Sequence, residues 1–323
     1  MTPARAALAS ALAAAALVAC SREPGEGTAR AAAPPTSASA IGSVAQPTPS
    51  PAPSATAAVM DAGADADIDA GPSDAGQANG CPAEMARVGR FCIDRWEAHL
   101  VAIDGGVETP HPHYERPVSG LAARSAPDVF PQGYISRVEA ASACSVAGKR
   151  LCSLGEWSRT CRGKKGKTYP YGFSGRNGVC NSGKKHLLTE LFGSNGRAWK
   201  YDENFNAPEL LKTEGYLAKT GAYDGCASED GVMDLVGNLH EWVSDSVDEA
   251  FVERMESEPI ERRKQPWREG NGIFASGFFS TTKEHGPGCT FLTIAHEPRY
   301  HDYSIGFRCC KTAEGEETKP KKK

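Results

Sequence analysis

The 323-residue sequence has little excess charge, few methionines and no long apolar segment beyond its N-terminus. Lys and Arg number 36 against 40 Asp and Glu, a net charge of −4. This near balance argues against a nucleic-acid-binding protein, whose binding face is usually strongly basic. No run of 18 apolar residues follows Cys20. The sequence therefore predicts no transmembrane helix after that point.

Aromatic residues are absent from residues 21–80, which contain no Phe, Tyr or Trp and consist mainly of Ala, Pro, Ser, Thr, Gly and Asp. Such a segment cannot bury enough apolar surface to offset the entropy lost on ordering. We therefore expect a disordered tether over residues 21–80. Residues 81–312 are long enough to form one globular domain, and residues 313–323 form a charged tail that ends in three lysines.

The N-terminal 20 residues have the composition of an export signal. Arg5 precedes an apolar run, which is followed by Leu17-Val18-Ala19-Cys20. These four residues resemble a bacterial lipobox, in which Cys20 becomes the lipidated first residue, and the alternative is a plain signal peptide with an incidental cysteine. Ser21 after the cysteine resembles sequences sorted to an outer membrane. We expect a protein of the bacterial cell envelope, anchored to the membrane by lipid on Cys20. Eleven cysteines against five methionines also favour an oxidising compartment.

Two helices are predicted from capping boxes, Ser136 with Glu139 and Ser153 with Glu156, which satisfy the free amide groups of a helix N-terminus. The first helix is expected to end near Gly148, the second near Cys161. The buried face expected for the first helix consists of Val138, Ala141, Cys144 and Ala147. The remainder is rich in turn-forming residues. The sequence therefore predicts an α+β fold with short strands, few helices and several disulfides.

Several motifs occur in a characteristic order along the domain. They are residues 92–98 (Cys-Ile-Asp-Arg-Trp-Glu-Ala), 147–151 (Ala-Gly-Lys-Arg-Leu), 156–157 (Glu-Trp), 169–172 (Tyr-Pro-Tyr-Gly), 231–242 (Gly-Val-Met-Asp-Leu-Val-Gly-Asn-Leu-His-Glu-Trp) and 305–309 (Ile-Gly-Phe-Arg-Cys). Together they resemble the sulfatase-modifying-factor family, to which the formylglycine-generating enzymes belong. The resemblance spans roughly residues 81–312 and implies a compact fold related to C-type lectins. Trp96, Trp157 and Trp242 are expected in the core.

The resemblance also implies a structural calcium site on the loop before Trp242. Its ligands would be the side chains of Asp234 and Glu241 and the backbone carbonyls of Gly237 and Leu239. Calcium prefers six to eight hard oxygen ligands, and this loop offers oxygens of both kinds. The alternative is that Glu241 only caps or pairs with a neighbour on the surface.

Oxidases of the family bind copper(I) through two cysteines five residues apart. Cys289 falls at the second cysteine position, but the first position is Glu284, and the usual lead-in is altered over residues 274–279. Because copper(I) prefers a pair of thiolates, copper chemistry is not expected. The sequence favours a binding module for an exported protein, a peptide or a glycan, with no nucleic acid as partner. The alternative is an oxidase with a rearranged metal site, in which Cys289 is catalytic and His285 or His296 supplies a nitrogen ligand.

The ten cysteines after Cys20 can all pair into five disulfides. The resemblance implies the pair Cys144–Cys309. The family partner of Cys161 would lie at position 294, which is Ile294, so we expect Cys161 to bond to Cys289 instead. The remaining expected pairs are Cys81–Cys92 and Cys180–Cys226, which are close in sequence, and Cys152–Cys310. The resemblance further places four residues beside the active groove of the family as candidates for a binding cleft: His285, His296, His301 and Tyr303.

Overall fold

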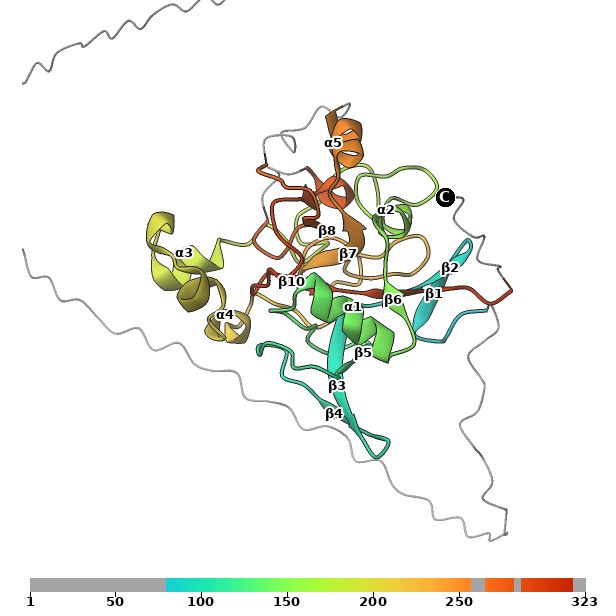
Figure 1. Ribbon diagram of the computed structural model, residues 1–323. Helices are drawn as coiled ribbons and strands as arrows, with labels where there is room; N and C mark the ends of the chain where they lie inside the picture. Colours follow the sequence, from blue (N-terminus) through green and yellow to red (C-terminus); the bar gives the residue numbers. More distant parts are fainter. Residues whose placement is uncertain (1–79, 257–264, 282–285, 316–323) are drawn as a thin grey trace, which may run out of the picture. The chain divides into compact units, whose positions relative to one another are not determined.

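The computed structural model describes residues 80–256, 265–281 and 286–315. The predictions for the signal peptide, Cys20 and the tether, and for Glu284 and His285, lie outside the described residues. Within them, the domain has mixed α and β structure with short strands and few helices, as the sequence predicts (Figure 1). None of its described helices has the length and apolar character needed to cross a membrane.

Three small sheets form the framework. The first has the order β1-β2-β11-β6, with strands Met85–Val88, Phe91–Asp94, Cys309–Thr312 and Arg150–Leu151. The second has the order β10-β7-β8-β9, with strands Ile305–Phe307, His240–Ser246, Gly272–Ala275 and Leu292–Thr293. The third has the order β4-β3-β5, with strands Val107–Pro110, Ala98–Asp104 and Ala122–Ser125. Only the β10–β7 pair is parallel among the described strands. Because β11 pairs with β2, the two ends of the described domain meet in one sheet.

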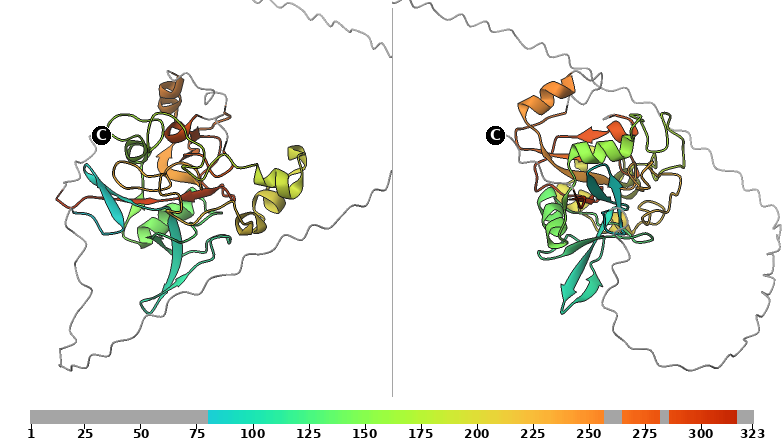
Figure 2. Two further views of the ribbon diagram at one scale, coloured as in Figure 1. Left: turned by 180° about the vertical axis from the view of Figure 1, so that it is seen from behind. Right: turned by 90° about the vertical axis from the view of Figure 1, so that its right-hand side faces the viewer.

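The helices are short and lie around these sheets. They are α1 (Arg137–Val146), α2 (Leu154–Arg162), α3 (Leu187–Phe192), α4 (Glu209–Lys212) and α5 (Glu249–Glu256). Short 3₁₀ turns occupy Gly196–Ala198 and Gly288–Thr290, and a π-helical turn occupies Tyr201–Phe205. The hairpin of β3 and β4 extends away from the rest of the domain, as Figure 2 shows.

Both predicted capping boxes are present, and they begin α1 and α2. The buried face predicted for α1 is partly wrong, because Val138 is 45% exposed and Ala141 is exposed as well. The buried side chains are Ala140, Ala143 and Cys144. A strict three-residue spacing drifts around a helix of 3.6 residues per turn, so the face buried against β5, β6 and β7 is rotated away from Val138.

Two of the three tryptophans expected in the core are fully buried. The indole N–H of Trp242 donates to the carbonyl of Ile135 at 2.9 Å, and Trp157 is bound to Glu241. Trp96 is only half-buried, since its ring lies beside Gly221 at the edge of the domain. Each buried indole thus keeps a partner for its polar atom.

Five disulfides cross the domain, and they are the five pairs that the sequence analysis expected. They are Cys81–Cys92, Cys144–Cys309, Cys152–Cys310, Cys161–Cys289 and Cys180–Cys226. Two of them tie neighbouring residues of β11 to α1 and to the segment that precedes α2. Multiple disulfides are typical of domains outside the cytoplasm, so the structure supports an extracytoplasmic location.

Candidate functional site

The loop before β7 surrounds a fully buried ion pair. The guanidinium of Arg308 donates two hydrogen bonds to the carboxylate of Glu241, each 2.6 Å long. The indole N–H of Trp157 donates to the same carboxylate at 2.9 Å. Glu241 is 0% and Arg308 1% exposed. The alternative in which Glu241 pairs at the surface is therefore wrong about its location, because the pair lies in the interior.

Two further carboxylates lie close to this pair. Glu97 accepts hydrogen bonds from the backbone N–H of Leu239 and the side-chain amide of Asn238, and Asp234 accepts one from the N–H of Gly221 at 2.7 Å. Burial raises the pKa of Glu97 well above its usual range, and the neighbouring charges of Asp234 and Glu241 raise it further. Burial also raises the pKa of Asp234 to about 6. Three carboxylates thus share one guanidinium.

The backbone of this loop is held in an unusual conformation. Asp234, Gly237 and Asn238 all have positive φ angles, of 60°, 85° and 56°. A Cβ atom at Gly237 would lie 2.2 Å from the carbonyl oxygen of Asn181, so only glycine fits there. Asn181 accepts from the N–H of Asn238, and the two side chains are hydrogen-bonded at 2.8 Å. The loop is therefore fixed on both sides before any ligand binds.

The residues that the resemblance assigns to calcium offer the oxygen donors that this ion prefers, although the Glu241 carboxylate already binds Arg308 and Trp157. The buried group of Glu97, Asp234, Glu241 and Arg308 has a formal excess of two negative charges when ionised. Within the described residues, no hydrogen bond to the carbonyls of Gly237 or Leu239 is found. No three His, Cys, Asp or Glu side chains of the described chain are grouped so that they could hold a metal by themselves. Backbone oxygens would thus have to supply a large share of the donors.

Cys289 lies in the short turn Gly288–Thr290 and is bonded to Cys161 of α2. It is 3% exposed, and its backbone N–H donates to the carbonyl of Thr168 at 2.8 Å. A sulfur in a disulfide is neither a nucleophile nor a thiolate ligand. The alternative hypothesis of a catalytic Cys289 is therefore wrong for this structure.

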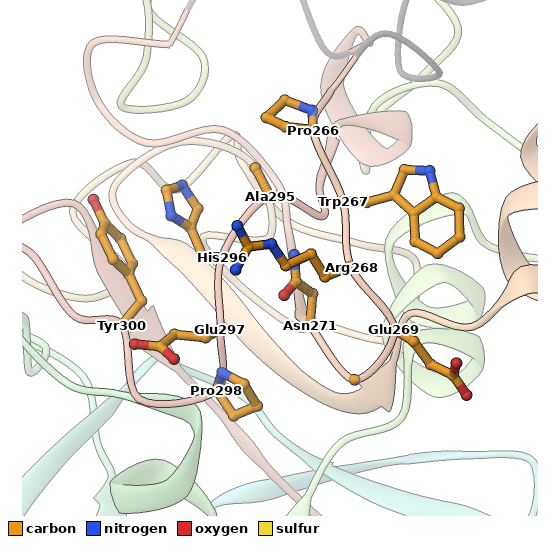
Figure 3. Close-up of a pocket in the computed structure, with 11 residues that line it drawn as sticks. Pro266, Trp267, Arg268, Glu269, Asn271, Ala295, His296, Glu297, Pro298 and Tyr300 are labelled. Atoms are coloured by element: carbon orange, nitrogen blue, oxygen red, sulfur yellow. The ribbon is translucent and has the colours of Figure 1, made fainter.

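A cavity of about 590 Å³ lies between the segment before β8 and the segment before β10 (Figure 3). We call it the His296 cleft, and its lining residues used below are Trp267, Arg268, Asn271, His296 and Tyr300. The Arg268 side chain extends toward His296, whereas Trp267 and Glu269 lie on the opposite side (Figure 3). Within the described residues Arg268 forms no ion pair, so its charge is available to a ligand.

The imidazole of His296 is fixed by aromatic rings on both faces. Tyr300 stacks on it at 3.8 Å between ring centroids and Phe274 at 5.5 Å. Burial lowers the pKa of His296, so the ring is neutral at pH 7. The side-chain amide of Asn271 donates to the carbonyl of Ile294 at 2.9 Å, which fixes the floor of the cleft. The arrangement presents fixed hydrogen-bonding groups beside the exposed cation of Arg268 and can bind polar ligands.

Tyr303 and His301, the other predicted cleft residues that the structure describes, do not line this cavity. Tyr303 is 2% exposed and packs among Phe278, Phe279 and Tyr134, so its ring lies in the core and not in this cavity. His301 is half-buried beside Tyr201, whose hydroxyl donates to its carbonyl at 2.7 Å. Arg268, Asn271 and Tyr300 were not predicted, because they belong to no motif and are brought together only by the pairing of β8 with its neighbours.

The fold and the loop define a domain of a known class. The chain belongs to the sulfatase-modifying-factor family, since the model described as "Sulfatase-modifying factor enzyme 1-like domain" matches residues 67–313. Among solved structures, PvdO from Pseudomonas aeruginosa is similar with 15% identity and a TM-score of 0.40, over 69% of this chain and 80% of that chain. CarF is similar with 13% identity and a TM-score of 0.39, over 69% and 87%. The I1 variant of Major Tropism Determinant has 15% identity and a TM-score of 0.36, over 72% and 53%. No curated protein matches the chain.

Proposed function

We propose that the chain is an exported, lipid-anchored binding protein whose family domain binds a peptide, a glycan or an exported protein without oxidising it. The main support for this proposal is the disulfide between Cys161 and Cys289. It occupies the sulfur at the second cysteine position of the family oxidases. All ten cysteines of the described residues form disulfides. A copper(I) site of two thiolates has no sulfur to use.

A thiol count tests this proposal. The mature chain, purified without reductant, is alkylated in the presence of a copper(I) chelator and its intact mass is measured. We expect no alkylation of the ten domain cysteines, and full alkylation after reduction in denaturant as the control. A reactive Cys289, or oxidation of a cysteine-containing peptide by the purified chain with copper(I), would contradict the proposal.

The ligand is proposed to bind in the His296 cleft, where Arg268 is available and Trp267 can report on binding. Trp267 is 36% exposed at the rim, so a ligand there changes its fluorescence. A panel of peptides and of neutral and acidic oligosaccharides is titrated against the chain. The response should vanish in Trp267→Phe and persist in Trp199→Phe, which changes a tryptophan outside the cleft. A response that survives Trp267→Phe places the ligand elsewhere.

The lipid anchor is proposed from the resemblance of residues 17–20 to a lipobox. Cells that express the chain are labelled with palmitate and fractionated. We expect label on the chain and recovery with membranes, and loss of both in Cys20→Ser. An unlabelled wild-type chain in the soluble fraction would show that residues 1–20 are a plain signal peptide.

A structural calcium ion is proposed on the loop of Asp234, Gly237, Leu239 and Glu241, supported by the family resemblance and by the carbonyls of Gly237 and Leu239, to which no hydrogen bond is found within the described residues. When bound, the ion would draw these carbonyls and the two carboxylates together. Calcium at 100 times its dissociation constant should stabilise the domain by about 2.7 kcal/mol over the chelated form. Thermal unfolding with calcium or a chelator measures this, and Asp234→Asn should remove the difference. Equal midpoints in both buffers would exclude the site.

A further inference from the structure

Positive charge is concentrated in one segment of the chain. Residues 157–189 contain eight Lys and Arg and no Asp or Glu. The rest of the chain contains the other 28 Lys and Arg and all 40 Asp and Glu, so it has a net charge of −12. The basic residues are Arg159, Arg162, Lys164, Lys165, Lys167, Arg176, Lys184 and Lys185. We call residues 157–189 the basic segment, which links α2 to α3 (Figure 1).

Acidic neighbours neutralise only part of this charge. Glu229 lies 3.8 Å from Arg159 and 3.5 Å from Lys167, and Asp230 lies in the field of the same cations. Glu190 lies 3.7 Å from Lys185. Eight cations against these three carboxylates leave an excess of five within the described residues. Such an excess creates a positive potential that attracts anions.

The basic segment is rigid although it contains little regular structure. Disulfides fix it at Cys161 and at Cys180. Between them, Tyr169 and Gly172 exchange two backbone hydrogen bonds of 2.8 and 3.0 Å. The guanidinium of Arg162 donates to the carbonyls of Gly166 and Lys167, which closes the turn that carries Lys164 and Lys165. A ligand that binds here does not have to order the segment, which lowers the entropic cost of association.

A cleft of about 210 Å³ opens along this segment, and Arg176 is the one charged residue among the described residues that line it. The Arg176 guanidinium lies 4.9 Å from the ring centroid of Tyr171, which stacks on Tyr169 at 5.5 Å. The hydroxyl of Tyr171 also accepts from the backbone N–H of Arg176 at 3.0 Å. The cation is therefore held at the wall of the cleft, where it can contact an anionic group inside.

Glycine lets the turn at Gly288 pack closely against the basic segment at one side of the cleft. Gly288 has φ +53°, and a Cβ there would lie 2.4 Å from the carbonyl oxygen of Thr168. Asn177 and Ser182 are exposed at the rim and offer neutral hydrogen-bonding groups. Among the described residues that line it, the cleft thus combines one fixed cation with neutral polar groups and no carboxylate.

We infer that the basic segment binds an anionic polysaccharide, one charged unit of which enters the cleft beside Arg176 while neighbouring units contact Lys164 and Lys165. An extended polymer with repeated carboxylate, sulfate or phosphate groups matches both a concave site for one unit and flanking cations. A flat membrane surface cannot enter the cleft. The inference goes beyond the proposed function, because it adds a second binding surface that shares no residue with the His296 cleft, so either can fail alone.

The test is a titration of the full mature chain carrying Cys20→Ser with polygalacturonate and heparin as anionic probes and dextran as the neutral probe. We expect binding to both anionic probes, none to dextran, and a decrease in affinity with salt as counterions are released. Arg176→Gln, and separately the double variant Lys164→Glu and Lys165→Glu, should each weaken binding about tenfold at low salt. Each variant removes contacts between a cation and an anionic group of the polymer, and fewer counterions are then released on binding.

The matched control is the double variant Arg197→Glu and Lys200→Glu, which makes the same change in net charge on exposed residues outside the basic segment. It should retain the affinity within about twofold, since remote exposed charges are screened. Equal losses in the control and the segment variants would overturn the inference. Tighter binding to anionic lipid vesicles or to single-stranded DNA than to the polysaccharides would also overturn it. The thiol count of the proposed function is unaffected by either result.

Discussion

At the scale of single residues, the buried pair of Arg308 and Glu241 is the contact on which the interior depends most. Replacing Arg308 by Met leaves three neighbouring carboxylates without a counter-ion inside the protein. Breaking a buried pair in this way costs about 3–5 kcal/mol. We expect Arg308→Met to lower the free energy of unfolding by that amount in urea titrations followed by tryptophan fluorescence.

The control for this prediction is an exposed ion pair. Arg116 lies 3.2 Å from Glu139, and its side chain is 55% exposed. Solvent screens such pairs, so Arg116→Met should change the free energy of unfolding by less than about 1 kcal/mol. If the two substitutions lower the free energy of unfolding equally, the burial of the Arg308 pair has no energetic consequence.

The lowered pKa of His296 makes the free energy of unfolding depend on pH. Burial lowers this pKa below the unfolded value of about 6.5. The unfolded chain therefore binds the proton first, and the stability contributed by the neutral ring is complete above pH 6.5 and lost as the pH falls. His99, His113 and His186 act in the same direction. Asp234 acts in the opposite direction, because its pKa is raised.

A comparison of two chains measures how much His296 contributes to this pH dependence. The free energy of unfolding is measured between pH 7 and 5 for the wild type and for His296→Phe, which keeps the stack with Phe274 and Tyr300. The variant should lose less stability as the pH falls. Parallel curves for the two chains would mean that His296 titrates normally in the folded state.

The even number of cysteines and the family resemblance were enough to predict the cysteine pairs, but neither the burial of Glu241 nor its partner was predicted. Arg308 lies 67 positions further along the chain, and its role depends on the parallel pairing of β10 with β7. Tyr303 was predicted to line a cleft because the family resemblance places it beside the active groove. Its ring is buried because the segment after Tyr300 turns into the interior. Contacts of this kind depend on tertiary structure and leave no local signal.

At the scale of secondary structure, the capping boxes have a measurable effect. The Ser136 hydroxyl accepts from the backbone N–H of Glu139, and the Glu139 carboxylate accepts from the N–H of Ser136 at 2.9 Å. Loss of an N-cap side chain costs about 1 kcal/mol. Ser136→Ala should therefore destabilise the domain by that amount. Ser142→Ala, an exposed serine of the same helix, should leave stability unchanged or raise it by a few tenths, about 0.3 kcal/mol. Equal losses of stability in the two variants would show that the N-terminal cap does not cause the effect.

The two helices with capping boxes could be predicted because caps are local. The strands could not, since the described ones span only two to seven residues and carry no long alternating pattern. The first sheet shows the difficulty. Its order β1-β2-β11-β6 joins residues near 90 to residues near 310, and the pairing is fixed by disulfides and by Asp94, which accepts from the backbone N–H of Cys309.

At the scale of the whole domain, the disulfides decide whether the fold persists. A domain of this kind has a total stability of about 5–15 kcal/mol, and each disulfide contributes about 2–4 kcal/mol. Five disulfides together therefore approach or exceed the whole stability. We expect the fully reduced chain to lose its near-ultraviolet circular dichroism and to unfold at 25 °C without denaturant. Reduced chain that still unfolds cooperatively at the original urea midpoint would contradict this. Because a reducing cytoplasm would then prevent folding, the same measurement connects the stability of the domain to its export.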